Sequence, residues 1–248
     1  NASLAIAGDI DTDRAFDLAD HFFGEIPRGP AVPIVTPPAL PVRESPSCWY
    51  FEDRVEFSRI YLSWPTPELF ALGDAALDLL GMILTGDKSA PLQRALLHDR
   101  QLATDVTAGQ ASHELTSLFM VAATAAPNAT LVEIENVITS ELTRMVSEGP
   151  SEDQLARAQR RIESDFAYCQ QTVGGFGGKS DQLNAYNVFA GTPGFFGTDL
   201  QRYRDIGISD IREVALIHLA MSNRVALSVV PNESENLALP DSILVAVS

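Results

Sequence analysis

Basic residues are few in this sequence. The chain has 17 Lys and Arg against 33 Asp and Glu, which gives a formal net charge of −16 at pH 7. Nucleic-acid binding needs a basic surface that neutralises phosphates, so this balance argues against that function. Long hydrophobic runs are also missing. No apolar segment reaches the roughly 18 residues that cross a bilayer, and we therefore expect no membrane span.

Cysteine and histidine are scarce as well. Cys48 and Cys169 lie far apart and form no CxxC motif. Each is expected to be a buried free thiol, and a disulfide stays open if the compartment is oxidising. The four histidines are His21, His98, His113 and His218. A catalytic zinc site usually takes two ligands one helical turn apart, and no two of these histidines lie that close, so we expect no zinc site in this chain.

Motifs of other hydrolases and of nucleotide-binding proteins are absent too. Neither GxSxG nor SxxK occurs, so serine chemistry has no support. Residues 173–180 read VGGFGGKS, but Val173 stands where a phosphate loop requires glycine. Because glycine is conformationally permissive, we expect residues 174–178 to form a flexible break between helices. The segment Gly86–Ser89 fails the same test and predicts a turn.

Proline, in contrast, is concentrated in one stretch. Seven of the 15 prolines lie between Pro27 and Pro46. Proline fixes φ and removes a backbone donor, so residues 27–46 are expected to form an extended, semi-rigid linker. Before it, residues 2–7 predict a strand and residues 12–23 an amphipathic helix. We interpret residues 1–26 as the closing strand–helix unit of a preceding, mostly missing half.

The segment after the linker has the pattern of a second structural half. Strands are expected over residues 48–52, 56–64, 104–110, 115–123 and 224–230. Helices are expected over residues 68–84, 90–98, 128–148 and from 151 past 168, with others beginning near 180, 198 and 209. The strand and turn at 226–232 repeat the type of residues 3–9, which suggests two homologous halves. We therefore assign residues 47–231 to a nearly complete half and residues 232–248 to a tail.

Three segments together resemble the insulinase/pitrilysin family of zinc metallopeptidases. They are Ala2–Pro30, which contains FFGEIP, then Leu79–Val106, and Glu148–Leu155, which is followed by an Arg-rich helix. The likeness covers about residues 1 to 231 and points to the C-terminal, non-zinc domain. The resemblance implies an α/β fold of the α+β type, with a mixed, largely antiparallel sheet covered by helices.

The resemblance also implies a function. The chain would be the non-catalytic part of a zinc metalloendopeptidase, closing a chamber and binding unfolded peptide. Zinc would lie in the missing half or in a partner subunit, and this chain alone would be inactive. Its partner would be the upstream catalytic half or another subunit, in a homo- or heterodimer. A soluble protein of the bacterial cytoplasm or periplasm is expected, and the sequence does not distinguish the two compartments.

Two substrate-binding positions of the family can be carried over to this chain. Active members of the family have an Arg and, seven residues later, a Tyr that hold the substrate. In this sequence the Arg position falls on Leu97 and the Tyr position on Thr104. Leucine donates no hydrogen bond, and threonine lacks the reach of a phenol. Arg94 and Arg100 are the nearby cations, but a shift of three residues on a helix turns the side chain elsewhere. These four residues are the candidate substrate-binding residues of a half that looks degenerate.

Two alternatives remain beside the peptidase hypothesis. The replacement of both polar groups at Leu97 and Thr104 favours a catalytically inert scaffold or assembly subunit, similar to the core subunits of respiratory complexes that resemble this family. The other alternative is an unrelated ligand-binding α/β domain. An HxxEH motif upstream in the full-length parent would favour the peptidase, and its absence the scaffold.

Overall fold

The computed structural model describes residues 2–31, 33, 35–36 and 39–245. The chain divides into two compact units. Unit 1 comprises residues 1–36 and 160–204, and unit 2 comprises residues 37–159 and 205–248. Among the described residues, no helix is long and apolar enough to cross a membrane.

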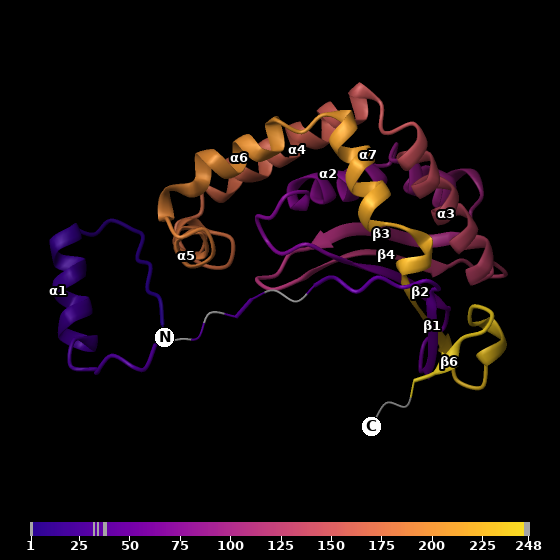
Figure 1. Cartoon of the computed structure of the whole chain (residues 1–248), viewed down its shortest axis with the longest axis horizontal. Helices are drawn as coiled ribbons and strands as arrows, with labels where there is room; N and C mark the ends of the chain where they lie inside the picture. Colours follow the sequence, from indigo (N-terminus) through magenta and orange to yellow (C-terminus); the bar gives the residue numbers. More distant parts are fainter. Residues whose placement is uncertain (1, 32, 34, 37–38, 246–248) are drawn as a thin grey trace. The chain divides into compact units, whose positions relative to one another are not determined.

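A six-stranded mixed sheet forms the centre of unit 2 (Figure 1). Its strands are β1 (Ser47–Asp53), β2 (Arg59–Thr66), β3 (Ala103–Ala111), β4 (Ser117–Ala125), β5 (Val225–Pro231) and β6 (Ile243–Leu244). They lie in the order β3-β4-β2-β5-β1-β6. Strand β1 is parallel to β5 and β6, and the other pairs are antiparallel. The predicted fold class, with a mixed and largely antiparallel sheet, is confirmed.

One face of this sheet carries the core. Strand β2 alternates, so that Ile60, Leu62 and Trp64 are fully buried while the residues between them are half-exposed. Three helices, α2 (Asp74–Thr85), α3 (Leu131–Ser147) and α7 (Ile208–His218), lie over this face (Figure 1). Helix α2 approaches β3 closely at Gly81, which has no side chain. A Cβ atom at this position would lie only 2.7 Å from the Cα of Gly109.

The helix boundaries of unit 2 follow from local hydrogen bonds. Thr130 and Glu133 form a capping box at the start of α3. Ser151 caps α4 (Glu152–Cys169), as predicted, by accepting a hydrogen bond from the backbone N–H of Gln154 at 3.2 Å. The helix expected over residues 90–98 consists largely of the π-helix η1 (Gln93–Asp99). The short helices η3 (Met221–Asn223) and η4 (Glu235–Leu237) flank β5.

Unit 1 is helical. It contains α1 (Thr12–Phe23), the second part of α4, α5 (Lys179–Phe189), η2 (Pro193–Phe195) and α6 (Phe196–Arg204). Phe166 packs edge-on against Phe196 and Tyr203, with ring centroids 5.2 and 5.7 Å apart. The buried Tyr186 hydroxyl donates to the Asp199 carboxylate at 2.8 Å, which ties α5 to α6.

Two expected elements are corrected by the structure. Residues 2–7 have no regular secondary structure, although their pattern predicts a strand. A strand needs a neighbour for its backbone groups, and no described strand pairs with this segment. The helix expected from residue 68 begins only at Asp74, because Phe70 and Gly73 have φ values of +65° and +93°. The buried Asp74 carboxylate holds this loop by accepting the Phe70 N–H at 3.0 Å.

Candidate functional site

The four predicted substrate-binding residues lie where η1 leads into β3. Leu97 is half-buried within η1, and Arg94 on the same helix forms an ion pair with Asp99 at 3.2 Å. Both side chains of that pair are more than half exposed, so it contributes little to stability. Arg100 is exposed and has no side-chain partner in the described part of the chain. The Arg94 and Arg100 side chains are therefore accessible to a ligand from solvent.

Thr104 occupies an irregular position in the sheet. The register of β3 against β4 shifts between Ala103 and Asp105, so Thr104 is the extra residue of a β-bulge. Its hydroxyl is exposed and lies 3.5 Å from the carbonyl oxygen of Thr124, which makes at most a weak hydrogen bond. No hydrogen bond joins Thr104 to Leu97, Arg94 or Arg100 among the described residues.

The outer edge of β3 is partly occupied by side chains of neighbouring helices. The Gln93 amide donates to the Val106 carbonyl at 3.1 Å, and the Thr85 hydroxyl accepts the Ala108 N–H at 3.0 Å. A peptide that adds to a sheet edge needs a row of free main-chain groups. Over Val106–Ala108 that row is interrupted, so strand addition at this edge is obstructed.

A polar cluster that the sequence did not single out lies on the other face of the sheet. Arg59 on β2 is opposite Thr124 on β4, and Thr124 is opposite Asp105 on β3. Arg59 Nη1 donates to both Asp105 oxygens, at 2.8 and 3.1 Å, and to the Thr124 hydroxyl. The Arg59 guanidinium also lies 5.2 Å from the centroid of the Tyr61 ring. We call this face, which lies opposite the buried side chains of β2, the open face.

The alternation of residues 56–64 is the sequence signal that could have indicated this cluster. It places Arg59 and Tyr61 on the same face of one strand. Their partners on β4 and β3 depend on strand order and on the bulge, which a single sequence does not specify.

The described residues contain no group of three or more His, Cys, Asp or Glu side chains that could hold a metal ion. The residues described by the structure therefore do not fit a zinc site. Both cysteines are half-buried free thiols. His218, at the end of α7, is half-buried, and burial lowers its pKa because the charged imidazolium is poorly solvated there.

The turn at Gly86–Ser89 is fixed by its own side chains. The Ser89 hydroxyl donates to Asp87 at 2.6 Å, and this hydrogen bond holds the pKa of the Asp87 carboxyl below its usual range. Arg157 of α4 lies 3.5 Å from the same carboxylate. This ion pair connects the turn to α4. The segment around Lys88 is therefore a structural turn and not a phosphate loop.

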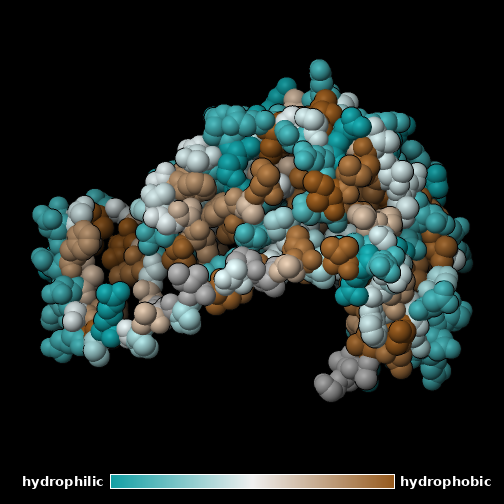
Figure 2. Space-filling view, in the orientation of Figure 1, coloured by the Kyte–Doolittle hydropathy of each residue, from teal (hydrophilic) through white to brown (hydrophobic). Residues whose placement is uncertain are grey.

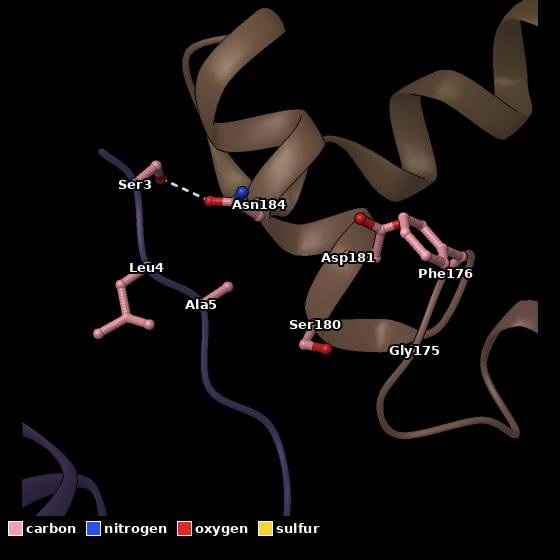
Figure 3. Close-up of a pocket in the computed structure, with 8 residues that line it drawn as sticks. All are labelled: Ser3, Leu4, Ala5, Gly175, Phe176, Ser180, Asp181 and Asn184. Atoms are coloured by element: carbon pink, nitrogen blue, oxygen red, sulfur yellow. Dashed lines mark hydrogen bonds between the residues drawn. The ribbon is translucent and has the colours of Figure 1, made fainter. Parts of the chain in front are cut away.

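The glycine-rich loop before α5 borders a cavity of about 340 Å³ within unit 1 (Figure 3). Ser3, Leu4 and Ala5 line one side, and the Ser3 hydroxyl donates to Asn184 of α5. Asp181 also lines the cavity, and no Lys or Arg does. A phosphate would meet a carboxylate without a compensating cation, so this is not a phosphate site. Helix α4, not a strand, precedes the loop, which confirms the predicted break between helices.

Comparison with known proteins identifies the class of this fold. The family model described as the peptidase M16 inactive domain matches residues 1–162. The zinc protease PqqE of Helicobacter pylori is 22% identical over 218 residues, which cover 87% of this chain and 48% of that protein. The chain therefore spans about half the length of the curated relative it matches.

Solved structures share the fold, and two of them serve as examples. A protease from Helicobacter pylori matches with a TM-score of 0.78 and 20% identity, over 91% of this chain and 54% of that one. A chain of complex III2 from Candida albicans matches with a TM-score of 0.70 and 15% identity, over 90% of this chain and 53% of that one. The present chain belongs to the M16, or insulinase/pitrilysin, family of zinc peptidases and is its inactive C-terminal domain.

Proposed function

We propose that this chain is the substrate-holding, non-catalytic half of an insulinase-type zinc metalloendopeptidase. It closes a chamber over an unfolded peptide, while a catalytic half or partner subunit supplies zinc and the activated water. The observation that carries the proposal is the match of residues 1–162 to the inactive domain of this family. The named zinc protease that the chain resembles is about twice as long, which leaves room for a catalytic half.

An apolar helix surface supports a partner for unit 1. Helix α1 has no buried residue, and Phe16 and Phe22 are 71% and 68% exposed. Hydrophobic residues lie at the surface of the α1 segment in Figure 2. Exposed clusters of large apolar side chains mark interaction surfaces. We propose that the upstream half covers this surface. The alternative is that a partner subunit covers it in a homo- or heterodimer.

The domain boundaries belong to the same proposal. Residues 1–26 close the preceding half, residues 27–46 link the halves, residues 47–231 form the inactive half, and residues 232–248 follow it. Within the inactive half, Leu97 and Thr104 face the substrate without donating strong hydrogen bonds. Arg94 and Arg100 contact the peptide from the exposed end of η1.

The test compares the chain alone with the chain mixed with its upstream half. Zinc content and cleavage of an unstructured fluorogenic peptide are measured in both samples. We expect one zinc and peptide cleavage only in the mixture. Stoichiometric zinc with proteolysis in the isolated chain would contradict the proposal.

A catalytically inert assembly subunit is the second candidate. Leu97 and Thr104 favour it, because neither supplies the polar group expected at its position. The fold shared with a chain of complex III2 from Candida albicans supports this candidate. A mixture that assembles but contains no zinc and cleaves no peptide would support this candidate.

A further inference from the structure

The Arg59 guanidinium is held in one orientation on the open face. Asp105 and Thr124 both accept hydrogen bonds from Nη1, and they come from two different strands. The side chain is 30% exposed, so it is neither sequestered in the core nor free to sample many rotamers. A ligand that reaches this face meets a preorganised donor group.

Several donors of this cluster are not engaged. Arg59 Nε is buried and has no hydrogen-bond partner. Within the described part of the chain, Nη2 of Arg59 and the hydroxyl of Tyr61 also form no hydrogen bond. Because Nε is enclosed by the protein, Nη2 is the guanidinium nitrogen that can donate to a ligand from solvent. Arg59 and Tyr61 therefore present donor groups on one face of β2.

The charge of the cluster indicates the type of acceptor. Asp105 compensates the positive charge of Arg59, and the whole chain carries a net charge of −16. An anionic ligand gains little from a neutral pair in an acidic protein. A carbonyl oxygen accepts the same hydrogen bonds without this electrostatic cost. The cluster therefore suits a neutral acceptor better than a carboxylate or phosphate.

The spacing of the two donors fits an extended chain. Arg59 and Tyr61 are two residues apart on one strand, which is roughly 6.6 Å along its axis. Alternate residues of any extended peptide have the same repeat. The face around them accepts apolar side chains, since Leu118 and Met120 of β4 are 46% and 41% exposed there.

We propose that Arg59 and Tyr61 position an extended, uncharged peptide on the open face by donating hydrogen bonds to its main-chain carbonyl oxygens. This inference rests on the proposed peptide-holding function and names the residues that perform it. Two other places on unit 2 offer a peptide fewer hydrogen bonds. The edge of β3 is obstructed by Gln93 and Thr85, and Leu97 has no donor.

Fluorescence anisotropy of a labelled peptide tests the proposal in the full chain, alone and together with its upstream half. The probe is an unstructured 20-residue peptide of Gly, Ser, Ala, Val and Leu with an amidated C-terminus. Tyr61→Phe removes one hydroxyl and should weaken binding about fivefold, the equivalent of one hydrogen bond. Arg59→Lys keeps the charge next to Asp105 but removes the Nη2 donor, and we expect at least the same loss of affinity. Tyr168→Phe, at a tyrosine that is 66% exposed on α4, is the matched control.

Each outcome separates this inference from the function on which it rests. Unchanged affinity in both variants, with wild-type binding intact, would overturn the role of Arg59 and Tyr61 but leave peptide holding in place. No binding by the wild-type protein in either sample would overturn the proposed function itself. An unchanged melting temperature of Tyr61→Phe shows that a loss of affinity arises from the site and not from unfolding.

Discussion

Arg224, which immediately precedes β5, and Glu135 of α3 form an ion pair whose side chains are only 13% and 15% exposed. Arg224 also donates to the Met221 carbonyl at 2.7 Å. The pair fixes α3 against the strand that lies next to β1. Its burial distinguishes it from the surface ion pairs of α4.

Removal of one partner of this pair should destabilise unit 2. Glu135→Ala leaves the Arg224 charge poorly solvated, and we expect a loss of about 3 kcal/mol in the free energy of unfolding. Urea denaturation measures the change. Asp165→Asn breaks the exposed Arg161–Asp165 pair and should cost less than about 0.5 kcal/mol. Equal losses of unfolding free energy in the two variants would contradict a stabilising role for the buried Arg224–Glu135 pair.

Glycine substitutions should have opposite effects in two helices. Gly81→Ala places a methyl group 2.7 Å from the Gly109 Cα and 3.0 Å from the Ala108 carbonyl oxygen. Because both obstacles are backbone atoms, we expect a loss of about 2 kcal/mol despite the better helix propensity of alanine. At Gly197 of α6 no atom lies within 4 Å of the added Cβ, so Gly197→Ala should be neutral or stabilise by up to about 1 kcal/mol. Thermal unfolding of both variants checks this contrast.

The half-buried His218 should make stability depend on pH. Its folded-state pKa lies below the ordinary value of 6.5. Between these two pKa values the unfolded chain therefore binds more protons than the folded chain. The stabilising contribution is complete above pH 6.5 and is lost as the pH falls through the folded-state pKa. Urea midpoints between about pH 7.5 and 5.5 should therefore decline more in the wild type than in His218→Gln. Leu216→Gln, an exposed substitution on the same helix, should keep the wild-type pH dependence.

Restoring the family's Arg and Tyr at positions 97 and 104 should raise peptide affinity if the chain is a peptidase half. It should leave peptide affinity unchanged if the chain is a scaffold. We expect Leu97→Arg combined with Thr104→Tyr to raise peptide affinity of the assembled mixture about 25-fold, as two added hydrogen bonds would. His98→Arg combined with Thr107→Tyr adds the same groups at exposed positions nearby and should have no effect. Equal affinities of the wild type and both variants would count against a substrate-facing role for Leu97 and Thr104.

Local signals predicted the elements that depend on local interactions. The first helix was expected over residues 12–23 and occupies Thr12–Phe23, because Asp11 caps it by accepting the Arg14 N–H at 3.1 Å. Helix α3 lies within the predicted 128–148, and the Thr130 capping box sets its start. Each of these boundaries is fixed by residues three or four positions apart.

Features that depend on distant residues were not predictable in the same way. The mostly apolar residues 68–73 have a helical pattern, but the hydrogen bond from the Leu69 N–H to the His113 carbonyl at 2.9 Å helps to hold them in a loop. The Arg59 cluster requires three strands in a particular register, with a bulge at Thr104. The family resemblance located Leu97 and Thr104 but carried no information about Arg59 and Tyr61.

The occupied edge of β3 has a consequence for how molecules of this fold meet one another. An unprotected edge strand is a template for intermolecular pairing and leads to aggregation. Gln93 and Thr85 saturate main-chain groups at Val106 and Ala108, in the middle of a nine-residue strand. Two copies therefore cannot extend one continuous sheet through this part of β3. Substitution of both side chains by alanine would free these main-chain groups and should favour edge-to-edge pairing between copies.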